Sequence, residues 1–173
     1  AAVRRSSNAD HLKPLNPVFV YPELSDKNAL KKLLNEGNYS YIIHAAGATR
    51  AKNSQAYNEV NADYTRMLAE AALEAQIPLK RFVFLSSLAA LGPLPYDREQ
   101  PITEATEPLP ITSYGKSKLL AENYLAELNE LPLTIIRPTA VYGPREKDLL
   151  ILFRTLNKGF DAYIGTAPQR LSF

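Results

Sequence analysis

A phenol and an ammonium lie four residues apart in Tyr114-Gly115-Lys116-Ser117-Lys118. Positions i and i+4 share a helix face, so Tyr114 and Lys118 are expected to project into one site if this segment is helical. A free phenol has a pKa of about 10 and is a poor base at neutral pH, but a fixed cation nearby favours its phenolate. The spacing therefore predicts a proton-transfer pair for a hydroxyl or carbonyl group.

Short apolar runs alternate with longer amphipathic stretches along the chain. We expect strands at 18–20, 41–46, 81–85 and 133–137, and helices at 26–36, 54–76, 113–129 and 148–157. This alternation predicts right-handed βαβ units and therefore an α/β fold with a parallel sheet. The 113–129 helix is expected to bury an apolar stripe made of Leu120, Tyr124, Leu125 and Leu128.

Ligands of parallel sheets bind outside the carboxyl ends of the strands. The segments that follow the expected strands are therefore the candidate site: Arg4-Arg5, Glu23-Leu24, 45–49, Ser86-Ser87 and 138–142. A proline-rich stretch, 92–110, precedes the Tyr-Lys helix, and so much proline predicts a long loop of the kind that often serves function.

The composition excludes several classes of protein. A chain of 173 residues with 46% apolar and 22% charged residues is typical of one globular domain. A net charge of +2 favours neither nucleic acid nor a membrane as partner. Absence of cysteine, with only two histidines far apart, argues against a metal site. No apolar run could span a bilayer and no signal-peptide pattern opens the chain, so we expect a cytoplasmic protein.

Five motifs stand in an order that is more specific than the Tyr-Lys pair alone: HAAG, VNADYT, FLSSLAALG, YGKSK and RPTAVYGP. In this order they resemble the extended branch of the short-chain dehydrogenase/reductase superfamily, which contains NAD(P)-dependent epimerases, dehydratases and dihydroflavonol reductase-like enzymes. The resemblance implies a Rossmann-like, doubly wound parallel sheet. It also implies hydride transfer, with Tyr114 as general acid/base, Lys118 beside it and Ser87 holding the substrate oxygen.

The same resemblance implies the residues that surround the ligands. The cofactor would contact Arg4, Arg5, Leu24, Ala45, Ala46, Gly47, Asn61, Ser86, Tyr114, Lys118, Pro138, Thr139 and Val141. The substrate would contact Thr49, Ser87 and Arg145. His44 is interpreted as a packed histidine at the end of a strand. Glu23 stands where family members more often have aspartate, so it is left out.

Arg4 and Arg5 favour NADP over NAD, because arginines accommodate the 2′-phosphate. Family members also have an earlier strand with a Gly-x-x-Gly-x-x-Gly loop and a C-terminal substrate-binding region, and neither is found in these 173 residues. We therefore interpret residues 1–173 as a partial NAD(P)-binding Rossmann domain that lacks the first strand, glycine loop and helix. As such, it is expected to bind NADP weakly and to be inactive.

Alternatives remain open at this point. The substrate is a nucleotide sugar or a ketone, and the reaction is a reduction or an epimerisation, since Leu88-Ala89-Ala90 replaces the acidic pair usual in sugar dehydratases. A non-catalytic nucleotide-binding or scaffold protein of the same fold is the alternative function. A homodimer through the 54–76 and 113–129 helices is the expected assembly.

Overall fold

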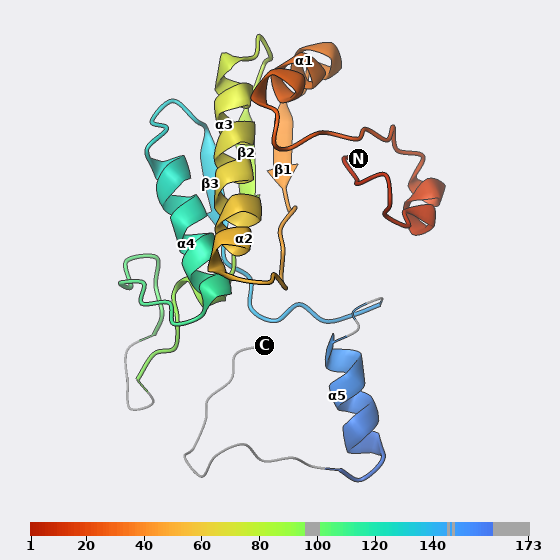
Figure 1. The fold of residues 1–173 in the computed structure, drawn as a ribbon, viewed down its shortest axis with the longest axis vertical. Coiled ribbons are helices and arrows are strands. Elements are labelled where there is room, and N and C mark those ends of the chain that lie inside the picture. The colour runs from red at the N-terminus through yellow and green to blue at the C-terminus, as the bar shows by residue number, and fades with distance from the viewer. Residues whose placement is uncertain (96–100, 145, 147, 161–173) are drawn as a thin grey trace.

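A three-stranded parallel sheet forms the centre of the molecule. The computed structural model describes residues 1–95, 101–144, 146 and 148–160. The strands are β1 (Tyr41–His44), β2 (Arg81–Leu85) and β3 (Leu133–Ile136), in the order β1-β2-β3 (Figure 1). Ile42 pairs with Phe82, and Phe84 pairs with Ile135. Consecutive strands are parallel and are joined by helices, which confirms the predicted α/β, Rossmann-like fold.

Helices pack on one face of this sheet (Figure 1). The helices are α1 (Lys27–Gly37), α2 (Ser54–Asn58), α3 (Tyr64–Glu74), α4 (Ser113–Ala126) and α5 (Asp148–Asn157), with 3₁₀ turns η1 (Asp10–Leu15) and η3 (Leu88–Ala90). The predicted helix over 54–76 is present, but a π-helical turn, η2 (Glu59–Asp63), separates α2 from α3. Such turns carry one extra residue and occur often at functional sites.

The core lies between the sheet and α1, α3 and α4. Phe82 and Phe84 are fully buried there, together with Leu30 and Leu125. Burial of a large apolar side chain contributes about 2–3 kcal/mol, so these residues hold the strand ends in place. Alternate residues of β1 point the other way, and the side chain of Ile43 is 69% exposed.

The beginning of α1 is fixed as the sequence predicts. The Asp26 carboxylate caps the helix by accepting a hydrogen bond from the Ala29 amide at 3.0 Å. The end differs by one residue, because Gly37 is still helical and Asn38 takes the left-handed conformation at φ 47°. Asparagine tolerates this conformation better than most residues, so it can replace glycine in ending a helix.

The predicted strand over 18–20 is reduced to one isolated bridge between Ala2 and Val20. The Val20 amide donates to the Ala1 carbonyl at 2.9 Å, and the Val3 amide donates to the Val20 carbonyl at 3.0 Å. Pro17 and Pro22 flank this segment and have no N–H to donate, which prevents a longer ladder.

The end of the proline-rich segment returns to the residue that follows η3. The Leu109 amide donates to the Leu91 carbonyl at 2.8 Å. Gly92 has φ 83°, and a Cβ there would lie 2.1 Å from the Leu109 carbonyl oxygen, so this turn requires glycine. Residues 96–100 of this segment lie outside the described part of the chain.

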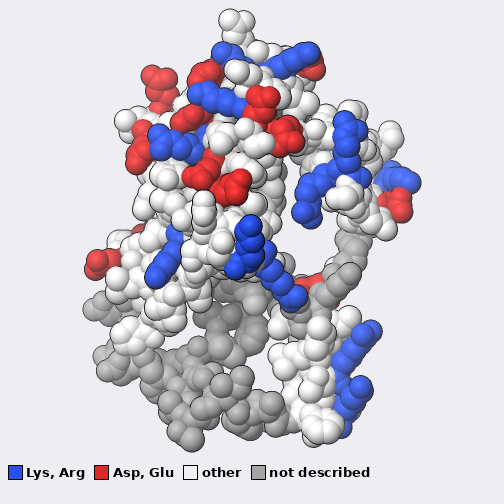
Figure 2. Space-filling view, in the orientation of Figure 1, with Lys and Arg blue, Asp and Glu red and all other residues white. Residues whose placement is uncertain are grey.

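The outer surface of α1 and α3 carries charges of both signs, which Figure 2 shows intermixed over the upper part of the molecule. Lys27 lies 2.6 Å from Glu74 and 3.1 Å from Glu70, and Arg66 lies 2.9 Å from Glu70. Partly exposed ion pairs of this kind each contribute less than about 1 kcal/mol. Among the helices of the described residues, none has the length and apolar character needed to cross a membrane.

Candidate active site

The start of α4 presents Tyr114 and Lys118 on one face. Thr112 begins the helix, because its hydroxyl accepts a hydrogen bond from the Gly115 amide at 3.0 Å. Tyr114 is half-buried, whereas Lys118 is only 4% exposed. The Lys118 ammonium donates to the Leu85 carbonyl at 2.7 Å, at the carboxyl end of β2. The helix therefore delivers its cation to the edge of the sheet where the strands end.

The surroundings of Lys118 are largely apolar. Its amine lies 4.3 Å from the centre of the Phe84 ring, a cation–π arrangement. Burial lowers the pKa of Lys118 to about 8, and the negative charge of Glu122 acts in the opposite direction. The amine is thus close to its titration range at neutral pH, as is useful for a group that takes part in proton transfer.

His44, at the end of β1, is buried as the sequence predicts. Its Nε2 lies 2.9 Å from the Thr65 hydroxyl, which itself donates to the Asn61 carbonyl at 2.8 Å. Nε2 must therefore donate its proton to the Thr65 hydroxyl. Burial, and secondarily the charge of Lys118, lowers the pKa of His44 to about 4.

The two serines after β2 point to different partners. The Ser87 hydroxyl accepts a hydrogen bond from the Ala89 amide at 3.1 Å and so begins η3. The Ser86 hydroxyl is buried and donates to the Glu122 carboxylate. The Ser86 hydroxyl thus has a protein partner, and its contact with a cofactor stays a prediction.

Close packing joins the Ser87 segment to the Tyr114 helix. A Cβ on Gly115 would lie 2.2 Å from the Ala89 carbonyl oxygen, so only a hydrogen fits between η3 and α4. Tyr114 also packs edge-on against the ring of Tyr57, with centroids 6.2 Å apart. These contacts limit how far Ser87 and Tyr114 can move relative to each other.

The loop after β1 is clamped by Asn61. The Asn61 amide accepts from the Ala48 amide at 2.7 Å and donates to the Ala48 carbonyl at 3.0 Å and to the Ser117 hydroxyl at 2.9 Å. Asn61 is fully buried inside the π-helical turn. One side chain therefore ties the HAAG loop to α4 at Ser117.

Gly47 packs closely against the Asn61 side chain. A Cβ on Gly47 would lie 3.0 Å from Asn61 Oδ1 and 3.9 Å from Lys118 Nζ. Ala45 and Ala46, just before it, are exposed. Small, exposed residues at a strand end allow a ligand to approach the backbone closely, as a dinucleotide requires.

The remaining predicted residues lie around this centre or apart from it. Thr49 is exposed, and its carbonyl accepts from the Tyr57 hydroxyl at 3.0 Å. Pro138 follows β3, and its carbonyl accepts from the Leu88 amide at 2.9 Å. Thr139 is half-buried, and Val141 is 71% exposed.

The other predicted contacts lie farther along the fold. Leu24 packs against the core cluster. Arg4 and Arg5 are exposed in the N-terminal segment on the β1 side of the sheet (Figure 1), and the guanidinium of Arg5 lies 5.0 Å from the Tyr21 ring centre. Arg145 lies outside the described residues.

The sequence analysis did not identify Glu122 or Arg137 as site residues. Arg137 follows β3 and donates through Nε to Glu122 Oε1 at 3.0 Å and through its terminal nitrogen to Oε2 at 2.5 Å. This pair raises the pKa of Arg137 further. The signal available in the sequence was the position of Glu122, four residues after Lys118 and eight after Tyr114, which places all three on one helix face.

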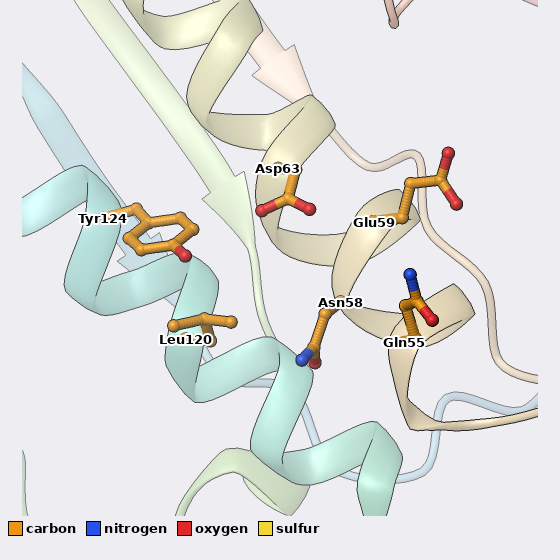
Figure 3. A pocket seen from close by; sticks show the side chains of 6 residues that line it. All are labelled: Gln55, Asn58, Glu59, Asp63, Leu120 and Tyr124. Atoms are coloured by element: carbon orange, nitrogen blue, oxygen red, sulfur yellow. The ribbon is translucent and has the colours of Figure 1, made fainter.

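A polar groove lies between α4 and the continuous segment formed by α2 and η2. Figure 3 shows six side chains from the two helical segments lining it. It has a volume of about 480 Å³ and is lined by Gln55, Asn58, Glu59, Asp63, Leu120 and Tyr124. Leu120 and Tyr124, which were predicted to be core residues, are half-buried: they pack against the core cluster and also line this groove.

Known sequences resemble this chain over most of its length. The NAD dependent epimerase/dehydratase family matches residues 1–159. A ceramide reductase from Caulobacter vibrioides is 31% identical over 152 residues, covering 88% of this chain and 41% of that protein. A UDP-glucose 4-epimerase from Vibrio cholerae is 31% identical over 147 residues, covering 76% of this chain and 42% of that protein.

Solved structures share the fold. The Bordetella bronchiseptica enzyme WbmG in complex with NAD aligns with a TM-score of 0.75 at 21% identity, covering 94% of this chain and 52% of that one. WbmH from the same organism, in complex with NAD⁺, aligns with a TM-score of 0.72 at 26% identity, covering 90% and 52%. The 173 residues thus span about two fifths of these curated relatives and about half of these solved chains.

Proposed function

Because this chain belongs to the NAD dependent epimerase/dehydratase family, we propose that it carries the catalytic groups of a nicotinamide-dependent epimerase, dehydratase or reductase. The observation that carries the proposal is the position of Lys118. Its buried ammonium bonds to the Leu85 carbonyl directly before Ser86-Ser87, on the helix face that also carries Tyr114. We infer that a phenol, an ammonium and a serine hydroxyl share one site at the carboxyl end of the parallel sheet, the usual location of a ligand site.

The residues present fit a nicotinamide dinucleotide. Gly47 offers backbone without a side chain close to the Lys118 amine, beside exposed Ala45 and Ala46. We propose that these three residues, with Asn61 behind them, line the cofactor cleft, and that Pro138, Thr139 and Val141 line its other side. When bound, the cofactor accepts and donates the hydride.

The protein groups would handle the proton and the substrate oxygen. Tyr114 would hold or give up a proton at its phenolic oxygen, in the position of a general acid/base. The Lys118 ammonium, fixed by the Leu85 carbonyl, would lie on the helix face that carries this phenol. The Ser87 hydroxyl would donate to the substrate oxygen and stabilise the charge that develops there.

Substitution of Tyr114 tests this assignment. In the full-length protein, Tyr114→Phe should abolish turnover of a responsive substrate while the Kd of the cofactor stays within about threefold, because the ring is kept and only the hydroxyl group is lost. Tyr124→Phe, the same change on the same helix but in the polar groove, should retain full turnover. Turnover retained by Tyr114→Phe would contradict the proposed mechanism.

The substrate class is open between nucleotide sugars and ketones, including lipid-linked ones, because relatives of both kinds match the chain. A panel of UDP-sugars and long-chain and aryl ketones with NAD(H) and NADP(H) would decide between them. We further propose that Arg4 and Arg5 receive the 2′-phosphate of NADP, since an exposed guanidinium suits a phosphate. Higher affinity for NAD than for NADP would refute that preference.

We also propose a homodimer through α2, α3 and α4, with the groove of Figure 3 at the contact. The supporting observation is that Leu120 and Tyr124, two side chains of α4 that are only half-buried against the core, also line this groove. Sedimentation of the full-length protein should give a dimer, and Leu120→Asp should shift it toward the monomer. A monomeric wild-type protein at micromolar concentration would disprove it.

A further inference from the structure

Glu122 is a buried carboxylate that connects three separate segments. It is 4% exposed and lies in the middle of α4. The Ser86 hydroxyl donates to it from the end of β2, and the Arg137 guanidinium donates to both of its oxygens from the end of β3. Every side-chain polar atom buried in the described residues has a partner, so this group is fully satisfied and its arrangement is specific.

The contacts of Glu122 act directly next to Ser87. The Ser86 amide donates to the Ile136 carbonyl at 2.8 Å, and the Leu88 amide donates to the Pro138 carbonyl at 2.9 Å. Ser87 therefore lies between two residues that are bonded to the segment after β3. With Ser86 also held by Glu122, the backbone on both sides of Ser87 is fixed relative to α4.

A second contact completes the attachment on the far side of Ser87. The Ala89 carbonyl packs against Gly115, where a Cβ would lie only 2.2 Å away. One end of the Ser86–Ala89 segment is thus held by the Glu122 carboxylate, and the other by close packing on the first turn of α4. Both attachments are on the helix that carries Tyr114.

We propose that Glu122 is a positioning residue, whose carboxylate fixes the strand end carrying Ser87 relative to the helix face carrying Tyr114. The inference rests on the proposed function, since it concerns how the same site is held together. Glu122 touches neither cofactor nor substrate in this proposal and acts through Ser86 and Arg137.

The charge of Glu122 has a second effect, on Lys118 one helical turn away. Its negative charge raises the pKa of Lys118, against the lowering caused by burial. The other charged or titratable groups nearby are Arg137 from β3, paired with Glu122, and His44 from β1, whose pKa of about 4 keeps it neutral. Glu104 from the proline-rich segment acts on Arg137.

Two substitutions of Glu122 separate the effect of its side-chain length from the effect of its charge. Glu122→Asp keeps the charge but is one methylene too short to bond Ser86 and Arg137 together, so kcat should fall about 10- to 100-fold, as expected for a misplacement near 1 Å. The Kd of the cofactor should change less than threefold. Glu122→Gln keeps the length, and its amide oxygen still accepts from Ser86, so kcat should fall less.

The charge effect should appear in the pH dependence of the Glu122→Gln variant. Loss of the negative charge should move the titration of the Lys118 amine, followed by NMR of ¹³C-labelled lysine, at least about half a unit to lower pH. The alkaline limb of kcat should move by the same amount. Glu122→Asp keeps the charge, so it should leave the Lys118 titration and the alkaline limb of kcat near their wild-type positions. A merely structural role of Glu122 would not produce this difference between the two variants.

Control variants separate the proposed role of Glu122 from the proposed function of the protein. Glu127→Gln, at the residue directly after α4 and with its side chain 60% exposed, should change neither kcat nor the pH profile. Ser86→Ala, which removes only the hydroxyl contact, should lower kcat about fivefold or more even if the Glu122 variants fail to fold.

Wild-type kcat in both Ser86→Ala and Glu122→Asp, with turnover abolished in Tyr114→Phe, would overturn the role of Glu122 alone. The same holds for an unshifted Lys118 titration in Glu122→Gln. Retained turnover in Tyr114→Phe would overturn the proposed function instead.

Discussion

Replacement of Gly115 by alanine should separate the Ser87 segment from the start of α4. The added Cβ would lie 2.2 Å from the Ala89 carbonyl oxygen and 3.0 Å from the Ala89 carbonyl carbon. Close carbon–oxygen contacts in proteins are about 3.3 Å, so η3 and α4 must move apart by about 1 Å. The obstacle is backbone and not a flexible side chain, so rotation of a side chain cannot relieve it.

The effects on stability and on activity should differ in size. Overpacking costs about 1–3 kcal/mol, whereas alanine is favoured over glycine inside a helix by about 1 kcal/mol. The free energy of unfolding should therefore fall by only about 0–2 kcal/mol. A displacement near 1 Å between catalytic groups costs about 100-fold in rate, so kcat should fall far more than stability does.

The assay compares kcat and denaturant unfolding of the full-length protein, the Gly115→Ala variant and Lys116→Ala. Lys116 is the exposed neighbour on the same helix, so its substitution should leave both quantities unchanged. If Gly115→Ala kept kcat within threefold of wild type, the close approach of η3 and α4 would not position the site.

Three further predictions concern the groups around this contact. Below about pH 6.5 the unfolded chain protonates His44 and the folded protein does not, so the free energy of unfolding should fall by up to about 3 kcal/mol from pH 6.5 to 4. In the His44→Gln variant, denaturant unfolding should show a weaker dependence of this free energy on pH. An equal pH dependence in the variant and the wild type would contradict the burial argument. Asn61→Ala leaves the Ala48 amide and carbonyl unpaired and should lower stability by about 3 kcal/mol, whereas Asn123→Ala, exposed on α4, should cost less than about 0.5 kcal/mol by the same measurement. In the full-length protein, Arg4→Ala with Arg5→Ala should weaken NADP binding about 10-fold or more without changing the Kd of NAD, as titration calorimetry with each cofactor would show; equal losses for both cofactors would contradict a 2′-phosphate contact.

Regular periodicity predicted most of the elements. The strand at 81–85 and the helix at 148–157 have the predicted bounds, because a continuous apolar run and a helical repeat each point to one structure. The 18–20 segment failed, since its apolar residues suggested a strand while two flanking prolines limited its pairing to one bridge. Local composition does not reveal whether a partner strand lies alongside.

The buried face of α4 shows why part of the site was missed. The sequence predicts that this helix buries its leucines and tyrosine, but much of the buried face consists of small, polar and charged residues: Gly115, Ser117, Lys118, Ala121 and Glu122. Apolar periodicity identifies a helix face that packs against a core. It does not identify a face that packs against strand ends through hydrogen bonds, and this is where the Glu122–Arg137 pair lies.

The π-helical turn at 59–63 sets the phase between the two halves of one long helix. One residue in an α-helix corresponds to about 100° of rotation, so a single extra residue lets α2 face α4 while α3 faces α1 and the core. Deletion of one residue here would give an uninterrupted α-helix in which only one half could keep its present partner. The turn thus acts as a one-residue insertion on which the fold depends. Among homologues, the length of the segment from α2 to α3 should therefore vary less than the lengths of the loops that flank it.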